Sequence, residues 1–100
     1  MKARLPIEHD ALIGFCRLHH IRRLSLFGSV LTGTARPDSD VDLLVEFESG
    51  RTPGLLGMAK LEAELSALMG GRRVDLRTPQ DLSRYFRDEV IRTAEVQFAQ

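Results

Sequence analysis

Apolar residues recur every three to four positions in three stretches of the chain, which is the period of an amphipathic helix. The first stretch predicts a helix over residues 7–19, and the second predicts a long helix that ends at Gly70 and Gly71. The third predicts a final helix that Asp81 or Ser83 can cap. The apolar positions are Ile7, Ala11, Phe15 and Leu18 in the first stretch, Leu55, Met58, Leu61, Leu65 and Leu68 in the second, and Phe86, Val90, Ala94 and Phe98 in the third.

Three shorter stretches, residues 22–27, 40–47 and 73–76, predict strands. The predicted order is therefore helix, strand, strand, helix, strand, helix. This order favours an α/β (α+β) fold, with one small mixed sheet and helices packed mainly on one face. A chain of 100 residues fits a single domain spanning 1–100.

Composition excludes several classes of protein. The chain is 43% hydrophobic and 28% charged, as is usual for a globular domain, and its formal net charge is zero. An autonomous nucleic-acid binder usually carries a basic surplus, so none is expected here. Cys16 is the only cysteine, and no apolar run suits a signal peptide or a membrane span. These features predict a cytoplasmic protein without an internal disulfide.

Two carboxylates begin the strongest predicted strand. Asp40 and Asp42 are two residues apart, so they point to one face of the strand while Val41 points into the core. At about 4 Å, two like charges cost about 1 kcal/mol in water and about 4 kcal/mol at an effective dielectric of 20. A bound cation would offset that cost, and Mg²⁺ prefers carboxylate ligands.

Asp75 is a charged residue inside the third predicted strand. If this strand lies beside the strand that begins at Asp40, Asp75 joins the first two acids. Three carboxylates could hold two metal ions, or one ion together with a base for an attacking hydroxyl. Earlier in the chain, Gly28 and Ser29 follow a strand and precede a helical turn, which directs backbone N–H groups at an anion. A phosphate cradle beside a metal site is the arrangement that nucleotidyl transfer needs.

Gly28-Ser29, ten residues, then Asp40-x-Asp42 resembles the signature of the DNA polymerase β-like nucleotidyltransferase superfamily. The surrounding sequence resembles the minimal nucleotidyltransferase (MNT) antitoxins over nearly the whole chain. Besides the signature, the similar segments are Gly50-Arg51-Thr52-Pro53-Gly54-Leu55, Val74-Asp75-Leu76 and Tyr85-Phe86-Arg87-Asp88-Glu89-Val90.

The resemblance implies a minimal nucleotidyltransferase fold and an antitoxin that pairs with a HEPN-domain RNase toxin. It implies transfer of AMP from ATP to a tyrosine of that toxin, which releases pyrophosphate and silences the RNase. Gly28 and Ser29 would hold the triphosphate. Asp40 and Asp42 would bind Mg²⁺, and Asp75 would complete the acid triad at the metal and help activate the acceptor hydroxyl. A homodimer or a hetero-oligomer with the toxin is consistent with such a small core.

One departure from the family pattern keeps two alternatives open. Many relatives carry Arg-x-Arg directly after Gly-Ser, whereas this chain has Val30-Leu31-Thr32, and Arg36 or an arginine of the partner would have to compensate. The first alternative is an antitoxin that acts only by binding its toxin. The second is transfer to a small molecule, as in the aminoglycoside nucleotidyltransferases, but this chain lacks the additional helical domain that those enzymes generally have.

Overall fold

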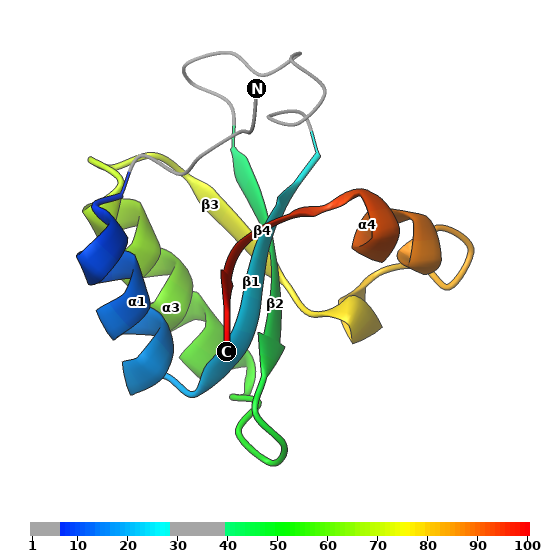
Figure 1. The fold of residues 1–100 in the computed structure, drawn as a ribbon, viewed down its shortest axis with the longest axis horizontal. Coiled ribbons are helices and arrows are strands. Elements are labelled where there is room, and N and C mark those ends of the chain that lie inside the picture. The colour runs from blue at the N-terminus through cyan, green and yellow to red at the C-terminus, as the bar shows by residue number, and fades with distance from the viewer. Residues whose placement is uncertain (1–6, 29–39) are drawn as a thin grey trace.

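A four-stranded mixed sheet runs through the middle of the molecule (Figure 1). This computed structural model describes residues 7–28 and 40–100. The elements in chain order are α1 (His9–Leu18), β1 (Ile21–Phe27), β2 (Val41–Phe47), α3 (Leu55–Leu68), β3 (Val74–Arg77), the 3₁₀ turn η1 (Pro79–Asp81), α4 (Arg87–Thr93) and β4 (Glu95–Ala99). The strand order is β3–β2–β1–β4, in which only β2 and β3 are parallel. The predicted mixed sheet is confirmed.

Helices α1 and α3 cover one face of the sheet (Figure 1). The strand residues that point to this face alternate with residues that point away, as a half-covered sheet requires. Together with apolar side chains of the two helices they form a single buried core. Its best-buried members are Cys16, Ile21, Leu24, Leu26, Val41, Leu43, Val45 and Leu65. Within residues 7–28 and 40–100, no helix has the length and apolar character needed to cross a membrane.

The segment from η1 to α4 lies on the opposite side of the sheet (Figure 1). Ser25 and Leu44 are register partners that point to this side, and both are buried, as is Leu82 directly after η1. The predicted packing of helices mainly on one face is therefore confirmed for the two long helices, while shorter elements cover part of the other face.

The prediction of one long final helix is wrong. Helix α4 ends at Thr93, and Ala94 has extended backbone angles (φ −63°, ψ 140°). The chain continues as β4, where Phe98 pairs with Leu24 of β1 and is buried. A spacing of four residues, from Ala94 to Phe98, returns to the same side in a helix and in a strand alike, so this spacing could not distinguish the two. Pairing with β1 decided in favour of the strand.

Candidate functional site

Two of the three predicted acids lie side by side at the start of their strands. Asp42 of β2 is the register partner of Asp75 of β3, and the two strands are parallel. Neighbouring strands lie about 4.8 Å apart, and paired residues point to the same face of the sheet. Both side chains are half-buried, and they point away from the face that α1 and α3 cover. The fold thus holds two negative charges close together on a partly open face.

Asp40 lies at the edge of this pair. It is exposed and directly precedes the first residue of β2. The N–H of Val41 donates to the carbonyl oxygen of Arg73 at 2.8 Å, which fixes the start of β2 against the chain that leads into β3. Asp40 is therefore anchored next to the acid pair through its peptide bond to Val41.

Gly28 packs directly against Asp42. Phe27, the last residue of β1, is the register partner of Asp42, and Gly28 follows with φ +82°. A Cβ atom at Gly28 would overlap with Oδ2 of Asp42 and would lie 3.0 Å from its Cγ. Only glycine fits here, both for its backbone angle and for its lack of a side chain. Its predicted partner in binding phosphate, Ser29, lies outside the described residues, as do Val30, Leu31, Thr32 and Arg36.

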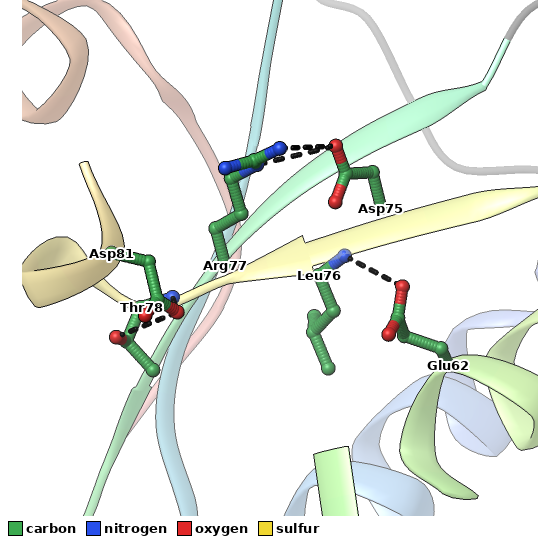
Figure 2. Close-up of polar contacts among 6 residues, drawn as sticks. All are labelled: Glu62, Asp75, Leu76, Arg77, Thr78 and Asp81. Carbon is green, nitrogen blue, oxygen red and sulfur yellow. Dashed lines mark hydrogen bonds and ion pairs between the residues drawn. The ribbon is translucent and has the colours of Figure 1, made fainter. Parts of the chain in front are cut away.

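An arginine that the sequence analysis missed also lies at this site. Nε and Nη2 of Arg77 each lie 3.2 Å from Oδ2 of Asp75 (Figure 2). The two side chains are 46% and 35% exposed, so the ion pair is open to solvent. The sequence did contain the signal, because a residue two positions after Asp75 in a strand must point to the same face.

Contacts on the other side of β3 hold this strand in place. The N–H of Leu76 donates to Oε2 of Glu62 of α3 at 3.2 Å (Figure 2). At the end of the strand, Oδ2 of Asp81 accepts hydrogen bonds from the backbone N–H of Thr78 at 3.0 Å and from its hydroxyl at 3.1 Å. The edge strand that carries Asp75 and Arg77 is thus fixed at its middle and at its end.

The donor set fits a magnesium ion. Mg²⁺ is usually held by one or two carboxylates and completes its coordination with water and substrate phosphates. Asp42 and Asp75 supply two carboxylates in register. Because Gly28 has no Cβ atom, the Asp42 carboxylate can occupy the space beside it. Among residues 7–28 and 40–100, no group of three or more His, Cys, Asp or Glu side chains is arranged to hold a metal ion by itself. Because two carboxylates leave coordination positions open for water and phosphate oxygens, the pair suits an ion that binds together with a phosphate-bearing substrate.

Comparison with known families assigns the chain to one of them. Residues 11–98 match the family described as the nucleotidyltransferase domain. The chain belongs to this nucleotidyltransferase family. The family resemblance and the fold class expected from the sequence are thereby confirmed.

Individual relatives agree with this assignment. Over 56 residues, 56% of this chain and 54% of the relative, the chain is 50% identical to protein adenylyltransferase MntA of Thermococcus cleftensis. It thus spans about half the length of that curated relative. A solved structure provisionally described as a minimal nucleotidyltransferase is 44% identical, with a TM-score of 0.69 over 86% of this chain and 85% of the other.

A more distant structure has the same fold. It is the tri-AMPylated HEPN toxin of Shewanella oneidensis in complex with its MNT antitoxin. The matching chain is 18% identical to this one, with a TM-score of 0.65 over 92% of this chain and 70% of the other. At this level of identity the match concerns the fold alone.

Proposed function

We propose that this protein is a cytoplasmic antitoxin that transfers AMP from ATP, with Mg²⁺, to a tyrosine hydroxyl of a HEPN-domain RNase toxin and thereby silences the RNase. The observation that carries the proposal is the register of Asp42 with Asp75, with Gly28 packed against Asp42. The name of the Thermococcus relative states protein adenylyltransfer, and the Shewanella complex contains an AMPylated HEPN toxin. Both support AMP as the transferred group, and the Shewanella complex supports a HEPN toxin as the partner.

The proposed reaction joins the acceptor oxygen to the α-phosphorus of ATP. That bond forms as the bond from the α-phosphorus to the bridging oxygen of the β-phosphate breaks, and pyrophosphate leaves. Asp40, Asp42 and Asp75 would hold Mg²⁺, which would supply positive charge against the phosphates. Asp75 also helps to activate the hydroxyl by accepting its proton. Gly28 and Ser29 hold the triphosphate where the strand β1 ends.

A second candidate function is neutralisation by binding alone. The observation that favours it is Val30-Leu31-Thr32, which stands where many relatives have two arginines after Gly28-Ser29. In that case the toxin and this chain form a tight hetero-oligomer, and the acids play no chemical part. Transfer to a small molecule has no comparable support in the described residues.

The decisive experiment follows the α-phosphate. ATP labelled at that position is incubated with Mg²⁺, this protein and the HEPN-domain protein encoded beside it. We expect label on the toxin, and its loss in Asp42→Asn, which keeps the shape of the side chain next to Gly28 while removing its charge. Asp88→Asn is the matched control, because Asp88 is an exposed acid on α4.

The outcomes separate the two functions. Label that persists in Asp42→Asn contradicts the site. Absence of label together with a tight complex in gel filtration favours neutralisation by binding. Label on a tyrosine, located by mass spectrometry, identifies the acceptor, and label on another residue type overturns the proposed acceptor.

A further inference from the structure

Arg77 is placed to contact whatever the acid pair binds. It is the last residue of β3 and points to the same face as Asp75, two positions earlier. Its register partner is the buried Leu44. The side chain of Arg77 points back along the strand toward Asp75 (Figure 2). The guanidinium ends beside Asp75, and Asp75 is in register with Asp42.

Among residues 7–28 and 40–100, Asp75 engages only two of the three guanidinium nitrogens of Arg77. Nε and Nη2 both contact one carboxylate oxygen, Oδ2. A guanidinium has five N–H donors, and its planar fork matches two oxygens of a phosphate. An exposed ion pair of this kind contributes little to stability, so exchanging the carboxylate for another anion costs little free energy.

We propose that Arg77 is a triphosphate-binding residue of this site, an inference that rests on the proposed function. In the free protein, Arg77 neutralises Asp75 and reduces its repulsion with Asp42. When the nucleotide binds, the guanidinium exchanges the Asp75 carboxylate for phosphate oxygens. Asp75 then becomes available to the cation that accompanies the nucleotide. One side chain thus serves as counter-ion in the free state and as ligand for the phosphates in the bound state.

This role predicts different effects on the binding of ATP and on the binding of Mn²⁺. In Arg77→Gln, we expect affinity for ATP in Mg²⁺, measured by calorimetry without any acceptor, to fall about tenfold, because a charge-assisted contact is lost. Affinity of the nucleotide-free protein for Mn²⁺, followed by electron paramagnetic resonance, should be unchanged or higher, because a positive charge that competes for Asp75 is gone. Arg77→Lys should recover part of the ATP affinity, since it restores the charge without the fork.

Arg22→Gln is the matched control. Arg22 lies on β1 and makes a similar exposed ion pair, with Nη2 3.3 Å from Oε1 of Glu46. Glu46 is four residues beyond Asp42 on β2, which corresponds to roughly 13 Å along a strand. The control should bind ATP as the unchanged protein does.

The results separate failure of this inference from failure of the proposed function. If Arg77→Gln binds ATP as tightly as the unchanged protein while label transfer persists, Arg77 is a counter-ion only and the inference is overturned. A fall in Mn²⁺ affinity in Arg77→Gln overturns it too, because it shows that the acid pair itself was disturbed. If the unchanged protein binds no ATP, the proposed function fails, and the inference fails with it.

Discussion

At the scale of single residues, Gly28 and Gly50 allow backbone strain to be separated from a steric clash. Both have positive φ, +82° and +76°, but a Cβ at Gly28 would overlap with Asp42, whereas a Cβ at Gly50 meets nothing within 4 Å. Forcing alanine into this region costs about 1–2 kcal/mol at either position. Any further loss in Gly28→Ala therefore measures the contact with Asp42.

We accordingly expect Gly50→Ala to lose about 1 kcal/mol of unfolding free energy, within the range for such strain, and to keep full transfer activity. Gly28→Ala should lose more, and its activity should fall by about a hundredfold, as follows from a displaced reacting group. Urea unfolding and label transfer measure the two effects. Equal stability losses with equal activities would show that Asp42 tolerates displacement.

Cys16 gives a prediction about pH. Burial raises the pKa of its thiol from 9.0 to about 12. Between these values the unfolded thiol ionises while the folded thiol stays protonated, so unfolding releases a proton. The free energy of unfolding should therefore hold below pH 9 and fall above it, by up to about 1.4 kcal/mol per pH unit from this group.

The measurement is the difference between the unchanged protein and Cys16→Ala in urea unfolding at pH 8 to 11. Other groups titrate in the same range, and the difference cancels their contribution. Parallel curves for the two proteins would contradict the effect of burial on this thiol.

The three acids were easier to predict from the sequence than Arg77. Strand alternation placed Asp40 and Asp42 on one face. Asp75 was expected to join them if its strand lies beside theirs, and β3 does pair with β2. Their role at a metal ion remains a prediction. Arg77 was missed because a lone arginine at the end of a short strand looks like an ordinary edge charge, although its spacing from Asp75 puts both on one face. Its closeness to Asp42 follows only from the register of β3 with β2.

At the scale of elements, β4 offers the clearest test of the corrected assignment. Phe98 is 8% exposed and pairs with Leu24, whereas Val96 is 54% exposed in the same strand. Phe98→Ala should lower the unfolding free energy by about 3 kcal/mol, as for other buried phenylalanines. Val96→Ala should change it by no more than about 0.5 kcal/mol. Val96 and Phe98 are two positions apart, and their difference in exposure goes with the register shift of β4 against β1 between Leu24 and Ser25. Chemical denaturation measures both losses, and similar values would contradict this register.

The success of sequence prediction differed between elements for a physical reason. Helix α3 was predicted well because five leucine and methionine positions repeat its period over four turns, and Gly70 and Gly71 end it. The pattern that predicted the final helix was shorter, and its spacing of four residues fits a helix and a strand alike. What fixes β4 is its pairing with β1, a contact between residues far apart in the chain, which no local pattern records.

At the scale of the whole molecule, the order of elements was enough to predict the fold class but not the order of strands. Alternating helices and strands imply a sheet with helices against it. The arrangement β3–β2–β1–β4 depends on pairings between distant segments. The site depends on the same pairings, because β1 leads directly into Gly28, β2 carries Asp42 and β3 carries Asp75.

The parallel pairing of β2 with β3 also has a kinetic consequence. Parallel strands cannot be joined by a tight turn, and here all of α3 intervenes between Asp42 and Asp75. Contacts between nearer segments of a chain form faster than contacts between distant ones. We therefore expect Asp42 to meet Gly28 through the pairing of β1 with β2 first, and to meet Asp75 only after α3 has packed on the sheet. In that order, the two acids would come together and repel each other only after the pairing of β1 with β2 and the packing of α3 are in place to offset the repulsion.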